Sequence, residues 1–395
     1  MAKKYSPQND AKWLSDNHDF ILIYAKSKLN WTPRLLPRTA EMNARYKNPD
    51  NDPKGAWKLI TLHAKSGNNP SFSYTFNNGV TWQPPSGTYP RFSAKTLKEY
   101  NDQGKIWFGT DGNSVPAVKN YLCEVKQGVT PLTIWTYDEV GHNQTAKEDV
   151  KKCFDGKNPF DTPKPVSLLK RICYIANLKD NDIVLDFFSG SATTAHAVMQ
   201  LNAEDGGHRK FIMIQLPESC DEKSEAYKAD YKNICEIGKE RIRRAGAKIR
   251  EENPMTTAEL DTGFRVLKLD STNMTDVYYS PLEINQQMLL EQVENIKPGR
   301  TDLDLLFGCL LDWGIPLNMP YVSENIDGCT VHTYNDGDLI ACFDKNVPES
   351  VVKAIAKRQP LRVVFRDSCF EDSPSKINVG EIFKMIAPDT RVKVI

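Results

Sequence analysis

"NDIVLDFFSGSATTAHAVMQL", residues 181–201, is the stretch of sequence that decides the fold. It begins as an apolar run, passes through a turn of small residues around Gly190, and continues with helical spacing. We therefore expect a strand, a tight turn and a helix. A strand that ends in a glycine turn and leads into a helix presents free backbone N–H groups at the carboxyl edge of a sheet. The stretch predicts a site for an anion or a nucleotide.

The turn differs from the two common phosphate-binding turns. A dinucleotide turn needs G-x-G-x-x-G, whereas Gly190 stands alone here, and the lysine of a P-loop is missing. Asp186, near the end of the strand, places a negative charge that would repel phosphate and attract an ammonium or sulfonium group. From these residues alone, an ordinary β-α unit whose hydroxyls cap its helix remains an equal alternative.

Helices and strands alternate on both sides of this stretch. Residues 165–176 have apolar side chains at helical spacing, residues 210–216 read as a strand, and residues 225–252 as one long charged helix. This alternation predicts an α/β fold with a parallel sheet and covering helices. Near the start of the chain, "DFILIYAKS" at 19–27 predicts a further buried strand.

Length and composition bound the class of protein. A chain of 395 residues predicts two or three domains, and 51 basic against 51 acidic residues leave no net charge to attract nucleic acid as a whole. The nine cysteines are scattered without zinc or redox spacing, which predicts free thiols and no metal site. There is no apolar stretch typical of a signal peptide or a membrane span, so we expect a cytoplasmic protein without membrane contact.

Changes in residue composition and in apolar periodicity along the chain predict four regions. The second is rich in Asn, Asp, Gly, Pro and aromatic residues, with a hairpin over 71–82 and a helix-like segment at 115–126, as expected for a recognition insert. The last is a small α/β domain, with a helix from Thr301 and an assembly or partner-contact role. The predicted boundaries are 1–30 for the start of the core, 31–156 for the insert, 157–262 for the cofactor-binding half, and 263–395 for the C-terminal domain.

The segment "DFFSGSATTAHAV" resembles the D-P-F-x-G-S-G-T-T cofactor motif of amino-methylating DNA methyltransferases. Phe187 replaces the proline of that motif and Ala192 its last glycine. The resemblance implies that Gly190 lets the backbone approach S-adenosylmethionine and that Asp186 faces its ammonium group. The matching residues are Asp186, Phe188, Gly190, Ser191, Thr193 and Thr194.

Three other segments resemble motifs of the same family. Thr162, Lys164 and Pro165 match its T-x-K-P motif, which implies the other wall of the cofactor pocket. "KFIMIQLPE" has Gln215 where the family has an acid for the ribose hydroxyls, with Glu218 three residues further on. "HDFILIYAKS" resembles the strand before the recognition region, which makes Tyr24 the candidate for contact with a flipped base.

The order of these motifs resembles that of the modification subunit of type III restriction-modification systems. The amino-acid sequences of whole segments over most of residues 4–250 resemble it as well. The resemblance implies a Rossmann-like, S-adenosylmethionine-dependent region with a recognition insert. It implies methyl transfer to adenine N6 in a short asymmetric site of double-stranded DNA. It also implies a homodimer with a second modification subunit, and a restriction helicase-nuclease partner that cuts unmodified DNA.

One motif of the family is missing. The D/N-P-P-Y/F/W tetrapeptide, which stacks the flipped base and binds its amino group, should precede residues 19–27 and does not occur in the sequence. "NPSF" at 69–72, "QPPS" at 83–86 and "NPF" at 158–160 each lack a required element. Without the strands that carry this motif, the sheet would have an open apolar edge.

Two interpretations of the missing motif stay open. The chain is half of a split or shortened methyltransferase that a second chain completes, or it is a non-catalytic component that binds DNA and the cofactor. A small-molecule methyltransferase is disfavoured, because a compact substrate does not need an insert of this length.

DNA contacts are expected from basic and aromatic residues of the insert. Solvated charges and core aromatics are the competing interpretation of each of these residues. For "KERIRRAGAKIRE" at 239–251 we expect a solvated helix face, and for His196 a packing role. The DNA-binding candidates are Arg34, Trp82, Arg91 and Lys95, with Arg38, Lys58, Lys105, Trp31, Trp107 and Tyr89 nearby in sequence.

Overall fold

The structure is a computed structural model that describes residues 12–275, 295–370 and 373–395. The chain divides into two compact units, Met1–Gly263 and Phe264–Ile395. Both units mix helices and strands. Within the described residues, none of the helices combines the length and the apolar character that crossing a membrane would need.

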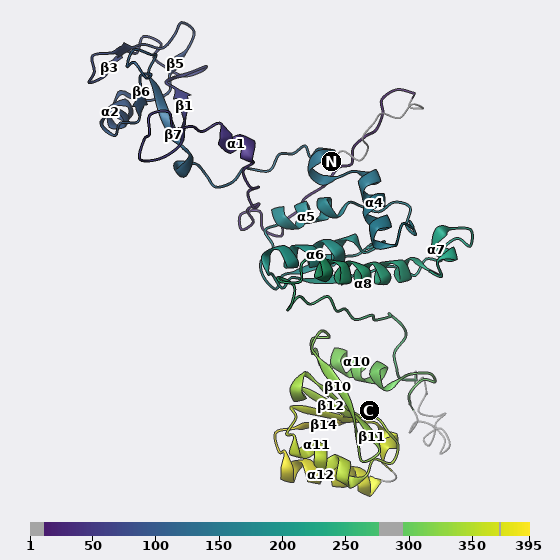
Figure 1. Ribbon diagram of the computed structural model, residues 1–395. Helices are drawn as coiled ribbons and strands as arrows, with labels where there is room; N and C mark the ends of the chain where they lie inside the picture. The colour runs from purple at the N-terminus through teal and green to yellow at the C-terminus, as the bar shows by residue number, and fades with distance from the viewer. Residues whose placement is uncertain (1–11, 276–294, 371–372) are drawn as a thin grey trace, which may run out of the picture. The chain divides into compact units, whose positions relative to one another are not determined.

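The first unit is built around two parallel strands. β8 (Ile183–Asp186) pairs with β9 (Lys210–Met213), and α6 (Thr193–Asp205) connects them. Figure 1 shows α6 between α5 (Val166–Ile175) and α8 (Ile234–Glu252). Cys173, Val198 and Leu201 form a core with apolar side chains of the strands, so α5 and α6 cover one face of the strand pair. The predicted helix over 165–176 and the strand-turn-helix over 181–201 are confirmed.

The other face of the strand pair is uncovered in the described residues. Ile183, Leu185 and Ile212, which alternate with the side chains that pack on the helices, are exposed. Phe187 and Ile214, just beyond the two strands, are exposed as well. Parallel strands are normally buried on both faces, and this pair is covered on only one face by the residues described.

The strand predicted over 19–27 is wrong for the described structure. This segment contains no strand, and Phe20, Leu22 and Tyr24 are largely exposed. A strand needs a hydrogen-bonding neighbour, and none of the described strands pairs with these residues. Their apolar pattern is that of a strand, but an apolar pattern alone does not form one.

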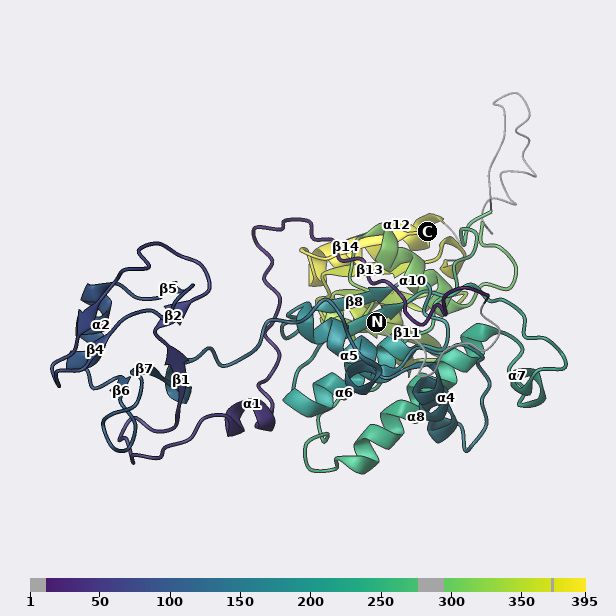
Figure 2. The same ribbon diagram turned by 90° about the horizontal axis from the view of Figure 1, so that it is seen from above.

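The insert forms small antiparallel sheets (Figure 2). The predicted hairpin at 71–82 is confirmed, with a turn closed by Gly79 at φ +86°. The helix predicted over 115–126 is wrong, because residues 117–121 are the central strand between residues 106–107, which precede it in the chain, and the distant residues 57–61. The strands and helices of this region are β1 (Trp57–Thr61), β2 (His63–Ala64), β3 (Tyr74–Thr75), β4 (Thr81–Trp82), β5 (Tyr89–Pro90), β6 (Ile106–Trp107), β7 (Ala117–Tyr121), α1 (Ala40–Ala44), α2 (Ala94–Asp102) and η1 (Leu122–Glu124).

α3 (Tyr137–Val140) and α4 (Asn143–Cys153) fall within the predicted insert 31–156, but they contact α5 and α8 of the helical layer. The single helix predicted over 225–252 is wrong in its first third. α7 (Glu225–Lys228) ends before Asp230, which has φ +69°, and α8 starts after Asn233, whose side chain accepts the Glu236 N–H. An Asn cap of this kind begins a new helix.

The second unit has a five-stranded sheet in the order β10-β11-β12-β13-β14, in which the first three strands are antiparallel and the last three parallel. α11 and α12 pack on one face and α10 on the other (Figure 1). The predicted capping box of Thr301 and Asp304 is confirmed. The elements are α10 (Asp302–Asp312), β10 (Tyr321–Ile326), β11 (Cys329–Tyr334), η2 (Asn335–Gly337), β12 (Leu339–Cys342), α11 (Glu349–Lys357), β13 (Arg362–Phe365), η3 (Asp367–Cys369), α12 (Ser373–Ile386) and β14 (Arg391–Val394).

This sheet brings together groups that are separated in sequence. The ligand atoms of Cys329, Cys342 and Asp344 lie within 4.8 Å of one another. The two thiols belong to the apolar core under α11 and α12, where burial raises the pKa of Cys342 to about 12. At neutral pH the Cys342 thiol is therefore protonated and packs as a small apolar side chain.

Candidate functional site

The turn between β8 and α6 has an unusual backbone. Gly190 has φ +49° and Ala192 has φ +57°, so both lie in the left-handed region. The Gly190 N–H donates to Gln215 Oε1 at 2.8 Å, and the Ala192 N–H donates to the Ser189 carbonyl at 2.7 Å. The amide of Gln215, which follows the neighbouring strand, thus holds the turn in this shape.

Asp186 lies at the end of β8, and its carboxylate is oriented by two donors. Thr194 donates its hydroxyl to one oxygen at 2.5 Å, and the Phe188 N–H donates to the other at 3.2 Å. Thr194 is in the first turn of α6, where a negative charge is favoured by the helix dipole. The sequence prediction that Asp186 places a charge beside this turn agrees with the geometry.

The turn also contacts the segment that precedes α5. A Cβ placed on Gly190 would lie 3.0 Å from Cζ of Phe160, so the aromatic ring rests directly on this glycine. Phe160 belongs to the "NPFDTPKP" segment, which leads to Thr162 and Lys164. At Gly190 the turn therefore meets the segment that leads to Thr162 and Lys164.

Gly190→Ala should lower the free energy of unfolding by about 2–3 kcal/mol, because it adds left-handed strain to a steric overlap with Phe160. Gly206→Ala is the matched control. Gly206 has φ +70°, and a Cβ added to it would have no neighbouring atom within 4 Å, so this variant reports the backbone strain alone. Urea unfolding of both variants measures the difference, and equal losses would show that Phe160 does not constrain the turn.

The other residues predicted to bind the cofactor differ in how deeply they are buried. Ser191 and Thr193 are buried at the start of α6, whereas Phe188 is 84% exposed and Thr162 is exposed. Lys164 Nζ pairs with Asp19 Oδ2 at 3.1 Å, which ties the N-terminal segment to the wall of the site.

Gln215 is engaged within the protein. Besides accepting from Gly190, its side-chain amide donates to the Leu216 carbonyl at 3.2 Å. Glu218, the nearby acid, is exposed. Gln215, which was predicted to contact the ribose, therefore stabilises the conformation of the turn through its side-chain hydrogen bonds.

Sequence reasoning missed Arg241 of α8. It is 0% exposed, and its Nη1 donates to Ser191 Oγ at 2.8 Å and Thr193 Oγ1 at 2.7 Å. Burial lowers the pKa of this guanidinium to about 10, which still leaves it charged at neutral pH. The solvated face predicted for 239–251 is thus wrong at this position. The signal in the sequence was spacing, since Arg241 falls in the apolar stripe of Ile237 and Ala245.

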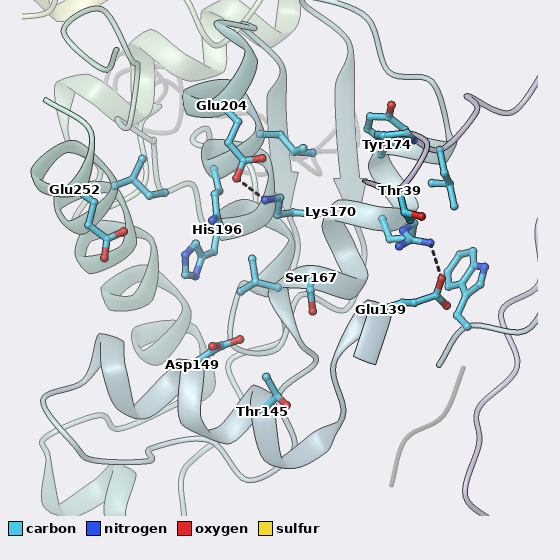
Figure 3. Close-up of a pocket in the computed structure, with 18 of the residues that line it drawn as sticks. Thr39, Glu139, Thr145, Asp149, Ser167, Lys170, Tyr174, His196, Glu204 and Glu252 are labelled. Carbon is cyan, nitrogen blue, oxygen red and sulfur yellow. Dashed lines mark hydrogen bonds and ion pairs between the residues drawn. The ribbon is translucent and has the colours of Figure 1, made fainter. Parts of the chain in front are cut away.

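A cavity of about 830 Å³ opens on the helical side of this unit. Figure 3 shows side chains of α4, α5, α6 and α8 around it, including Asp149, Glu252 and the ion pair of Lys170 with Glu204. His196 lines it, and burial lowers the pKa of His196 to about 3, so the ring is neutral. None of the residues of the turn lines this cavity, which is therefore separate from the β8–α6 site.

The DNA-binding candidates have different environments. Trp82 is 5% exposed in the core of the insert, so its ring cannot stack on a base without unfolding that core. Arg34 lies with its guanidinium 4.4 Å from the centre of the Tyr174 ring. Arg91 and Lys95 are exposed near the start of α2.

A buried ion network holds the insert together. Lys119 of β7 pairs with Asp50 and, at 2.7 Å, with Asp52, which also accepts the Tyr121 hydroxyl at 2.7 Å. The Lys119 hydrogen bond lowers the pKa of Asp52 to about 2. Lys119 also lies 5.2 Å from the centre of the Trp57 ring. One lysine thereby fixes the loop around residues 50–52 to the sheet.

Comparison with known proteins gives a consistent set of similarities. A family model described as DNA methylase matches residues 1–227. The chain is 38% identical over 272 residues to the type III restriction-modification enzyme StyLTI Mod subunit of Salmonella typhimurium, covering 67% of this chain and 39% of that protein. It is 30% identical over 305 residues to the EcoP15I Mod subunit of Escherichia coli, covering 75% and 44%.

A more distant relative is the type II methyltransferase M.KpnI of Klebsiella pneumoniae, 26% identical over 255 residues, with 57% of this chain and 56% of that protein covered. The chain spans about two fifths of the length of the Mod subunits that it matches.

Proposed function

The chain belongs to the DNA methylase family, and on that basis we propose that it is the cofactor-binding and DNA-recognition part of a type III modification subunit. In this proposal the β8–α6 turn binds S-adenosylmethionine, and the methyl group goes to N6 of adenine in double-stranded DNA. The observation that carries it is the turn itself, in which Asp186 and the start of α6 meet around Gly190.

The chemistry of the turn suits this cofactor better than a phosphate. The Asp186 carboxylate offers a fixed negative charge to the ammonium group of the methionine moiety. Gly190 gives the turn its left-handed shape and leaves room for the Phe160 ring, and the buried hydroxyls of Ser191 and Thr193 border the same turn. Phe188, Thr162 and Lys164 provide the remaining walls, and Gln215 fixes the shape between them.

The proposed fold is a Rossmann-like methyltransferase region that needs more than the two strands described. The exposed apolar face of β8 and β9 and the unpaired segment around Tyr24 both have the composition of sheet partners. We propose that a polypeptide segment carrying the D/N-P-P-Y/F/W motif adds its strand here. That segment would stack the flipped base and hydrogen-bond the amino group, which lets the nitrogen attack the methyl group.

The insert is proposed to recognise DNA through its exposed cations. Arg91 and Lys95 are free to approach phosphates, and Arg34 lies where the insert leaves the cofactor-binding region. Trp82 is withdrawn from this set, because it is a core residue. Phosphate contacts of this kind position a protein on the duplex, while polar groups in the grooves read the bases.

Replacing Arg91 and Lys95 together by alanine should weaken binding to double-stranded DNA and reduce the salt dependence of binding. Each lost phosphate contact lowers the slope of log K against log salt by about 0.9, so we expect a change of about 2. Fluorescence anisotropy at several salt concentrations measures it. The control pair is Lys353→Ala with Lys384→Ala, two exposed lysines of α11 and α12 in the second unit. An unchanged slope in the first pair would exclude these cations as phosphate contacts.

Partners are proposed from the relatives. A type III modification subunit would act with a second copy of itself and with a restriction helicase-nuclease subunit. The second unit, Phe264–Ile395, is the proposed region for such contacts.

The proposed function is tested with labelled S-adenosylmethionine and mixed-sequence DNA. The chain is assayed alone and after addition of a polypeptide that carries the tetrapeptide. We expect cofactor binding in both samples and label at N6 of adenine in the mixture. Cofactor binding with label on cytosine, or with no label in any mixture, would contradict adenine methylation.

A further inference from the structure

Arg241 is the most deeply buried cation near the proposed cofactor site. Its side chain comes from the middle of α8 and reaches Ser191 and Thr193 through a single nitrogen, Nη1. Among the described residues, its Nε and Nη2 atoms have no hydrogen-bonding partner. The guanidinium is thus held by two neutral hydroxyls of the turn rather than by a carboxylate.

Such an arrangement is unfavourable for stability. Taking a cation out of water costs several kcal/mol, and a well-packed apolar residue of similar volume is often as stable or more stable. The charge of Asp149 acts on Arg241, but among the described residues the guanidinium forms hydrogen bonds only with the two hydroxyls and no ion pair with this carboxylate. Stability alone therefore does not explain an arginine at this position.

The same helix touches the turn at a second point. A Cβ added to Gly238 would lie 3.3 Å from the Gly190 carbonyl oxygen and 3.6 Å from Cβ of Ala192. Gly238 and Arg241 are three residues apart and so share one face of α8. Gly238 allows the helix backbone to approach, and Arg241 binds the two hydroxyls from that position.

We propose that Arg241 is a positioning residue for S-adenosylmethionine: it holds the hydroxyls of Ser191 and Thr193 so that the left-handed turn keeps the shape the cofactor needs. This inference rests on the proposed function of the turn. It assigns the buried guanidinium a binding role that costs the protein stability.

The test compares Arg241→Met, Arg241→Lys and the control Arg244→Met in the full chain. Each is measured by calorimetry with S-adenosylmethionine and by thermal unfolding without it. We expect Arg241→Met to raise the Kd about 10- to 100-fold, as for hydrogen bonds from a charged donor, with an unchanged or higher Tm. Arg241→Lys, which keeps one donor, should recover part of the affinity. Arg244 pairs with Asp155 and Glu240 away from the turn, so its variant should bind normally.

A double variant tests the route of the effect. If Arg241 acts through Thr193, then Arg241→Met combined with Thr193→Val should bind little worse than Arg241→Met alone. The proposal is overturned by an unchanged Kd in Arg241→Met, or by a fall in Tm or loss of folding that lysine does not relieve. Failure of the parent chain to bind the cofactor would instead overturn the proposed function itself.

Discussion

An Asp186→Ala chain is expected to bind S-adenosylmethionine about 10- to 150-fold more weakly than the parent chain. The variant loses a charge-assisted hydrogen bond to the ligand, worth about 1.5–3 kcal/mol. It also frees the Thr194 hydroxyl, which donates to this carboxylate at 2.5 Å, and so loosens the first turn of α6. Calorimetric titration gives the affinity directly.

Two further variants separate these effects. Asp186→Asn keeps an acceptor for Thr194 but removes the charge, so its affinity should lie near that of the alanine variant if the charge dominates. Asp182→Ala removes an acid from the beginning of the same strand, where it caps the Lys179 N–H at 2.7 Å, and should bind normally. An Asp186→Ala chain within threefold of the parent would show that this carboxylate does not contact the ligand.

Lys119→Met is expected to have the largest effect on stability, about 3 kcal/mol in the unfolding of the insert. Removing one partner of a buried ion network leaves the others uncompensated. Here the variant leaves Asp50 and Asp52 without their cation and the Tyr121 hydroxyl beside an unpaired acid. Denaturant unfolding followed by tryptophan fluorescence is suited to this change, because Trp57 lies beside the lysine.

The matched control is Lys95→Met on the exposed face of α2. A surface substitution of this kind changes stability by less than about 0.5 kcal/mol. If the two lysine variants unfold at the same denaturant concentration, the network does not stabilise the insert.

The centre of the fold could be predicted because its determinants are local. The strand, the glycine turn and the helix of residues 181–201 follow one another in sequence, and each shows its own period. The capping box at Thr301 is local in the same sense. In such segments, propensity, capping and apolar spacing agree with the tertiary structure.

Two of the segments whose secondary structure was predicted wrongly depend on pairing with other strands. Residues 117–121 read as helical, but they form a strand because the distant β1 pairs along their whole length, while the preceding strand β6 pairs on the other side. Residues 19–27 read as a strand, yet strand pattern alone does not supply a hydrogen-bonding neighbour.

The candidate site divides in the same way. The residues of the turn could be identified from a contiguous motif, whereas Arg241 arrives from a helix about fifty positions later. A charged residue in an apolar helix stripe is a weak signal, since side chains of that type usually reach solvent. Trp82 was predicted to contact DNA, but it is buried in the core of the insert. The neighbouring sequence does not distinguish a buried aromatic residue from one that stacks on a base.

The measurement that tests the central claim most directly is photo-crosslinking of labelled S-adenosylmethionine to the full chain, followed by peptide mapping. The account predicts label in the peptide that contains residues 181–201 or in the one that contains residues 158–165, with competition by unlabelled cofactor. Label confined to the second unit, or no competable label at all, would contradict the assignment of the β8–α6 turn as the cofactor site.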